Sequence, residues 1–245
     1  MNLKPSDDAL LENFANMLRQ EMQMQFTAPV NIRQIVEAKG IIAYLRPAQD
    51  DFSGMAVKIS GDTSGLFMLV NTAHQYAKQR FTACHELYHL LFQPSFESSY
   101  DTDLFAKTDN LEELKANHFA SFLLLPKIGL QMLTPVEQQR KDRITMGTLL
   151  MLQHRFQCSH SALIYRLLRM GWISASYLES LKGSIVSHAR EYGYSLSLYH
   201  TTNQTELIGD YNVKARELLE RNVISRQKYE ELLADMKIEY TELPF

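Results

Sequence analysis

A helix-compatible segment at residues 80–91 contains the residues best suited to chemistry, in the pattern His-Glu-x-x-His. In an α-helix, residues i and i+4 project from one face about one turn apart, so His85 and His89 can bind one Zn²⁺ ion. Glu86 lies about 100° around the axis, beside the metal. A carboxylate there can accept a proton from a zinc-bound water. The pattern therefore predicts metal-assisted hydrolysis, most often of a peptide bond.

The alternative interpretation is an amphipathic helix whose two histidines are polar surface residues. The flanking residues argue against it, because they are apolar or aromatic: Leu87, Tyr88, Leu90 and Leu91. Such a helix is expected to be buried, and burying two imidazoles without a partner is costly. Pro94 then ends the helix after both histidines.

A catalytic zinc site needs a third protein ligand. Ser95 stands six residues after His89, where a metzincin would have a third histidine. A second helix is predicted over residues 111–125, capped by Asp109 or Asn110 and closed by Pro126. A carboxylate from this helix is the remaining source of a third ligand.

Within this second helix, Glu113 and Asn117 share one face, and small alanines beside them allow close approach to the histidine helix. We predict that Glu113 is the third ligand. Asn117, one turn later, can hold a ligand histidine through its second ring nitrogen. Glu112 is the rival ligand, but it points about 100° away and is better explained as a helix N-terminal charge.

The two segments together resemble the ImmA/IrrE-type metallopeptidases, which are bacterial and phage zincins with a glutamate third ligand. The similarity lies in two runs: Arg80-Phe81-Thr82-x-x-His85-Glu86-x-x-His89 and Glu113-x-x-Ala116-Asn117-x-Phe119-Ala120-x-x-Leu123-Leu124-x-Pro126. It covers residues 30–126 and, more weakly, 144–172.

The resemblance implies zinc bound by His85, His89 and Glu113, with Glu86 as catalytic acid and base. It also implies cleavage of a regulatory protein such as a transcriptional repressor or antitoxin. Two positions depart from the family pattern, because Tyr88 replaces the usual glycine and Cys84 replaces a small apolar residue.

Composition limits the class of protein. The chain has 245 residues, 45% of them hydrophobic and 22% charged, and a formal net charge of −3. This charge argues against a general binder of nucleic acid or of anionic membranes. Cys84 and Cys158 form no disulfide pattern, the first residues show no signal peptide, and no apolar run reaches the ~18 residues of a membrane span. A cytoplasmic protein is expected.

The hydrophobic pattern predicts the α+β class. Helices are expected near residues 10–22 and 31–39, followed by strands at 41–45, 54–59 and 66–71. The last two strands are expected to pair as a hairpin, with Asn71-Thr72 capping the histidine helix. The resemblance to the ImmA/IrrE-type metallopeptidases implies a zincin-like core with a small antiparallel sheet and two metal-ligand helices. Residues 93–108 are polar and predict a surface loop near the cleft.

The second half of the chain is predicted to be mostly helical. We expect a metallopeptidase domain at 1–135, a helix-turn-helix-like subdomain at 136–182 and a small accessory region at 183–245. Residues 195–200 alternate like a strand. The middle subdomain contains Arg155, Arg166 and Arg169, which leaves a second hypothesis open: a zinc-containing regulatory protein that binds DNA or a partner protein through its helical half. The sequence does not indicate the oligomeric state.

Overall fold

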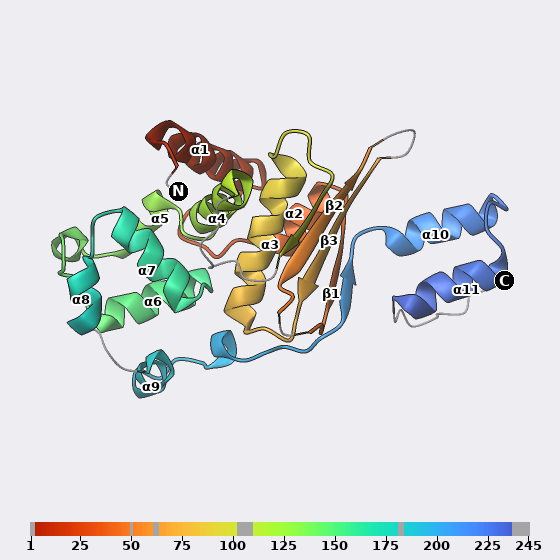
Figure 1. Ribbon diagram of the computed structural model, residues 1–245. Helices are drawn as coiled ribbons and strands as arrows, with labels where there is room; N and C mark the ends of the chain where they lie inside the picture. Colours follow the sequence, from red (N-terminus) through yellow and green to blue (C-terminus); the bar gives the residue numbers. More distant parts are fainter. Residues whose placement is uncertain (1–2, 50, 61–63, 102–109, 181–183, 237–245) are drawn as a thin grey trace.

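The computed structural model describes residues 3–49, 51–60, 64–101, 110–180 and 184–236. Its centre is a five-stranded sheet in the order β4-β2-β3-β1-β5. The strands are β1 (Ile41–Arg46), β2 (Gly54–Ile59), β3 (Gly65–Asn71), β4 (Ser98–Asp101) and β5 (Glu206–Ile208). Helix α3 (Tyr76–Leu91) crosses one face of this sheet (Figure 1).

The helices before and after the sheet complete an α+β fold, as predicted. They are α1 (Pro5–Glu21), α2 (Ile32–Ala38), α4 (Leu111–Leu124), α5 (Lys127–Leu133), α6 (Met146–Phe156), α7 (His160–Arg169), α8 (Ala175–Ser180), α9 (Ile185–Glu191), α10 (Tyr211–Glu220) and α11 (Arg226–Asp235). Short 3₁₀ turns lie at Val136–Gln139 and Ser197–Tyr199. No helix of the described ranges is long and apolar enough to cross a membrane.

The sheet is mixed, whereas an antiparallel one was predicted. β2 and β3 form the expected antiparallel hairpin, but β1 pairs with β3 in parallel, with Ile41 opposite Leu66. The cause is strand order: β3 lies between β1 and β2, so the chain from β1 to β2 skips one strand position. β4 and β5 form the two edges.

Two further predictions of secondary structure were wrong. The polar pattern of residues 93–108 predicts a loop, but residues 98–101 form the edge strand β4, paired with β2; residues 102–108 of the predicted loop lie outside the described residues. Residues 195–200 were assigned to a strand but contain a 3₁₀ turn at Ser197–Tyr199, and the strand of this region is β5. The Tyr199 hydroxyl accepts a hydrogen bond from Gln153, which fixes the turn against α6.

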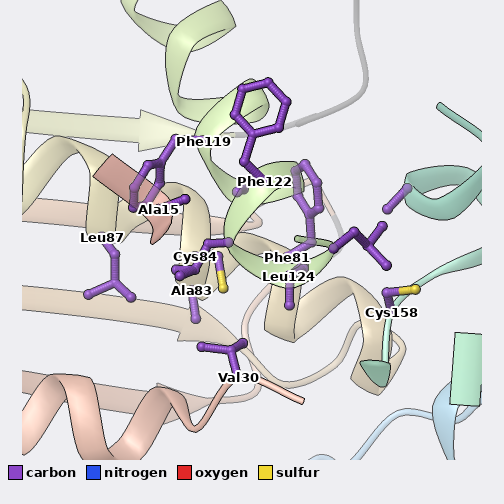
Figure 2. Close-up of a cluster of buried hydrophobic side chains, with 14 of the residues drawn as sticks. Ala15, Val30, Phe81, Ala83, Cys84, Leu87, Phe119, Phe122, Leu124 and Cys158 are labelled. Atoms are coloured by element: carbon purple, nitrogen blue, oxygen red, sulfur yellow. The ribbon is translucent and has the colours of Figure 1, made fainter. Parts of the chain in front are cut away.

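The main hydrophobic core holds α3 between the sheet and the helices α1 and α4. Figure 2 shows Leu87 of α3 and Phe119 of α4 in the same buried cluster. Ala15, Ala116 and Ala120 are fully buried, and their small side chains permit the close approach of the three helices. Helices α6 and α7 contribute to the same core, whereas α10 and α11 pack mainly through a separate small cluster. The domain boundaries after residues 135 and 182 stay a prediction.

Candidate metal centre

Helices α3 and α4 bring three side chains with metal-binding atoms together. His85 and His89 lie one turn apart on α3, with 3.0 Å between their Nε2 atoms. Oε2 of Glu113, from the first turn of α4, lies 3.0 Å from Nε2 of His85 and 3.6 Å from that of His89. Their ligand atoms all lie within 4.8 Å of one another. The structure therefore places the three predicted ligands in one cluster.

The two imidazoles are oriented by hydrogen bonds to their other nitrogens. Nδ1 of His85 lies 2.9 Å from Oδ1 of Asn117 on α4, as predicted for this residue. Nδ1 of His89 is bonded to Oε1 of Gln93, just after the end of α3. Each amide oxygen accepts the Nδ1 proton, so Nε2 of each ring keeps its lone pair toward the cluster. Sequence reasoning missed Gln93, although its i+4 spacing from His89 was a usable signal.

The geometry of this cluster fits zinc. A tetrahedral zinc ion with bonds of ~2.0–2.1 Å separates its ligand atoms by about 3.3 Å. The three separations here, 3.0, 3.0 and 3.6 Å, lie around that value. Two neutral histidines with one carboxylate form the ligand set of thermolysin-type catalytic sites. The arrangement is thus typical of a zinc peptidase.

Comparison with protein families agrees with this geometry. Residues 47–168 match the Peptidase M78 family model, described as the IrrE N-terminal-like domain. The chain belongs to the M78 metallopeptidase family. The matched region contains all three residues of the metal cluster, together with Glu86, Gln93 and Asn117. A search of curated proteins found no match.

Glu86 of this M78 peptidase is completely buried on α3, next to His85 in the sequence. β2 passes close to it: a Cβ atom at Gly54 would lie 2.9 Å from Oε1 of Glu86 and 2.4 Å from Cγ2 of Thr82. Both distances are shorter than the contacts that Cβ atoms make in proteins, so no residue with a Cβ atom fits at position 54 without a shift of its neighbours. Glycine at position 54 therefore leaves the space that the Glu86 carboxylate occupies.

Electrostatics keep Glu113 ionised. Burial alone would raise the pKa of its carboxyl group, but the hydrogen-bond and electrostatic interactions of this carboxylate with His85 and His89 outweigh burial and hold the pKa well below its usual range. An ionised carboxylate between two imidazoles is the form that binds a cation.

Tyr88 and Glu112 form a second link between the two ligand helices. The Tyr88 hydroxyl donates a 2.8 Å hydrogen bond to Oε2 of Glu112, and Lys115 donates to the other carboxylate oxygen at 2.6 Å. Burial, followed by the bond to Glu112, raises the pKa of Tyr88. Glu112, the rival ligand, thus fastens the first turn of α4 beside Glu113. Tyr88, at the position of a usual glycine, supplies the other half of that link.

Helix α3 begins differently from the prediction. Asn71 and Thr72 were expected to cap it, but the helix begins at Tyr76, and its N-cap residue Gln75 makes no side-chain capping bond. Asn71 instead bonds the backbone of the segment between β1 and β2. Asn110 does cap α4, by accepting from the backbone N–H of Glu112.

Cys84 precedes the first ligand histidine but is unsuited to metal binding. It is fully buried, and burial raises the pKa of its thiol to about 12, so the thiolate is not formed near neutral pH. In Figure 2 it lies in the core beside Ala83. The residue fills space, as a small hydrophobic side chain does.

Proposed function

We propose that this M78 metallopeptidase is a zinc-dependent endopeptidase that cleaves a regulatory protein. The observation that carries the proposal is the convergence of His85, His89 and Glu113 on one point, next to a buried glutamate. When bound, Zn²⁺ would supply a Lewis acid that polarises the scissile carbonyl group and lowers the pKa of water.

Within this proposal the residues of the chain have distinct roles. His85, His89 and Glu113 hold the metal, and Asn117 and Gln93 fix the two imidazoles. Glu86 is the general base, which accepts a proton from the attacking water and passes it to the leaving amine nitrogen.

The substrate is proposed to be a transcriptional repressor or antitoxin, on the strength of the resemblance to ImmA/IrrE-type peptidases. The sheet offers a place for an extended segment of such a protein. β4 is an edge strand and contacts α3, so its outer side lies at the boundary of the metal-bearing region. An edge strand can bind an extended peptide through main-chain hydrogen bonds.

The test combines metal analysis with a search for cleaved proteins. Wild type and Glu86→Gln are each expected to hold about one zinc per chain, because the substitution leaves the ligands intact. New protein N-termini in cells that express each chain are then compared by mass spectrometry. Loss of a general base lowers the rate by about 10²–10⁴-fold, so the specific new terminus should appear only with wild type.

Glu137→Gln is the matched control, since Glu137 is an exposed carboxylate of the turn Val136–Gln139, away from β4 and the metal cluster in the sequence. It should retain cleavage. Equal cleavage by wild type and Glu86→Gln would contradict the role of Glu86. Absence of zinc from purified wild type after zinc loading would contradict the metal assignment.

Among the residues that the structure describes, no contact favours the second hypothesis, binding to DNA or to a partner protein through the helical half. The three arginines on which it depended bond to other parts of the same chain. Arg166 donates to the backbone oxygen of Leu125 and pairs with Glu12, Arg155 donates to a backbone oxygen near α2, and Arg169 pairs with a carboxylate of α1. These contacts fasten α6 and α7 to the peptidase core.

A further inference from the structure

A cavity of about 620 Å³ lies on the side of α3 away from the metal ligands. Its walls come from α2, from β1 and β3, from the first turns of α3 and from the segment that leads into β5. None of the metal-site residues lines it. Its size is that of a small-molecule site.

The inner wall of the cavity is apolar. Val36 from α2, and Ala43, Met68 and Val70 from the sheet, line it and are almost completely buried. Ala83 of α3 completes this wall and lies near Val30 in Figure 2. Such a surface favours an organic ligand with an apolar body over an inorganic ion.

The charged side chains that line the cavity are two arginines and one glutamate, so positive charge is in excess. Arg33 and Glu206, at the opening, form an ion pair with each other. Arg80 also lines the cavity, is only 8% exposed, and has no carboxylate partner among the residues that the structure describes. The cavity therefore has one uncompensated positive charge.

The hydrogen bonds of Arg80 leave donors available. Its Nε donates to the backbone oxygen of Gln157 at 3.1 Å, and one N–H of Nη2 donates to that of Val30 at 2.7 Å. A guanidinium has five N–H donors, and within the described ranges the three others, including both on Nη1, have no acceptor. By contrast, the Gln79 side chain of the lining bonds two backbone oxygens and the Thr202 hydroxyl.

We propose that this cavity binds a small amphipathic carboxylate, with the carboxylate on Arg80 and the apolar body against the sheet. Guanidinium and carboxylate groups match in geometry and charge, and a buried cation gains more from such a partner than an exposed one. The site is distinct from the metal centre and does not depend on the proposed peptidase activity.

The probe for this proposal is decanoate, with decanol as the uncharged ligand of equal chain length. Isothermal titration calorimetry on the whole protein should show that decanoate binds at least about tenfold more tightly than decanol, because charged hydrogen bonds are the stronger ones. Binding should also raise the melting temperature, since the ligand binds only the folded chain. A decanoate concentration about 100 times a micromolar dissociation constant would saturate such a site. If decanoate at this concentration gave neither binding heat nor a change in melting temperature, the proposal would be overturned.

Two variants locate the site. Ala43→Phe fills the cavity from β1 and should weaken decanoate binding about tenfold or more. Its matched control is Val57→Phe on β2, whose side chain lies on the opposite face of the sheet from Ala56 and its cross-strand partner Met68. Val57→Phe should bind decanoate like wild type. Equal weakening by both variants, or by neither, would contradict the location.

Arg80→Met tests the charge. In this variant decanoate and decanol should bind with affinities equal within about twofold. A preference for decanoate that survives the substitution would remove Arg80 from the site. Arg80→Met loses the bonds to Val30 and Gln157 and could fail to fold for that reason. In that case the comparison of Ala43→Phe with Val57→Phe still decides whether decanoate binds in this cavity.

Discussion

Two helix pairs of this protein have opposite ways of using polar residues. In α3 and α4, several polar side chains are buried and bond a residue of another element, such as His85 with Asn117. In α10 and α11, the ion pairs are exposed and join residues three or four apart on the same helix, such as Arg226 with Glu230. Only the first arrangement fixes side chains of different helices relative to each other. A metal site requires that fixation, whereas the second arrangement requires only a stable helix.

The largest expected effect concerns Arg19, a fully buried arginine of α1. It donates to the backbone oxygens of Leu123 and Leu124 in α4. It also donates to the backbone oxygen of Gln25, in the loop that follows α1. Arg19→Met leaves these buried carbonyls unsatisfied and should lower the free energy of unfolding by about 3–5 kcal/mol, measured by urea denaturation. Arg226→Met in the exposed pair should change it by less than about 0.5 kcal/mol. Similar losses in both variants would remove the distinction between buried polar contacts that join different helices and exposed ion pairs within one helix.

The next effect concerns the amides that orient the ligand histidines. Gln93→Ala and Asn117→Ala should each weaken zinc binding by about 10–100-fold, because each frees one imidazole. A competition assay with a coloured chelator measures this change. Gln227→Ala is the control, since Gln227 bonds Glu231 on the surface of α11. Unchanged zinc affinity in Gln93→Ala would show that the bond to His89 has no role in metal binding.

A smaller effect depends on pH and on His118 of α4. Burial and the nearby Arg166 lower the pKa of His118 from its usual value of 6.5 to about 4. The neighbouring bonds agree with a neutral ring: Tyr165 and Arg169 both lie within hydrogen-bond distance of Nε2, and Nδ1 donates to Asp8. The ion pair with Asp8 would by itself favour the charged ring, but two donors on Nε2 leave no place for a second proton.

The sign of the pH effect follows from these pKa values. Between pH 6.5 and about 4, the unfolded chain binds a proton at His118 that the folded chain does not. The stability due to the neutral ring is complete above pH 6.5 and falls as the pH is lowered through this window, by about 1–2 kcal/mol. Unfolding curves of wild type and His118→Gln should therefore converge toward pH 4. Parallel curves would contradict the neutral form.

The smallest effect is expected from the C-terminal pair. Tyr229 packs with Ala215 and Leu233 in the separate small cluster. Tyr229→Ala should loosen this pair, seen as faster hydrogen exchange in α11, yet shift the main unfolding transition by less than about 0.5 kcal/mol and leave zinc affinity unchanged. A loss of zinc affinity as large as that of Gln93→Ala would show that the two regions are coupled.

The site was largely predictable because its geometry is local to two helices. One helical turn separates His85 from His89, and the phase of α4 places Glu113 and Asn117 on one face. Gln93 follows the same rule, but it lies outside the motif and near a helix end that sequence cannot place closely. The catalytic role of Glu86 remains a prediction.

The sheet was less predictable because its order depends on contacts between distant residues. Ser98 to Asp101 show no apolar alternation, and they form a strand only through pairing with β2. Conversely, Ser195 to His200 alternate well but form a turn, because Tyr199 bonds a side chain of α6. The parallel pairing of β1 with β3 has no local signal, since it depends on where the chain places β2.

The pairing of β5 with β1 also has a consequence for synthesis of the chain. Residues 206–208 complete the sheet beside residues 43–45, which leave the ribosome about 160 residues earlier. At roughly 5–20 residues per second, the open edge of β1 waits about 10–30 s for its neighbour. During that interval the nascent protein exposes a hydrogen-bonding edge to other chains, so a ribosomal pause before residue 206 should increase aggregation during translation.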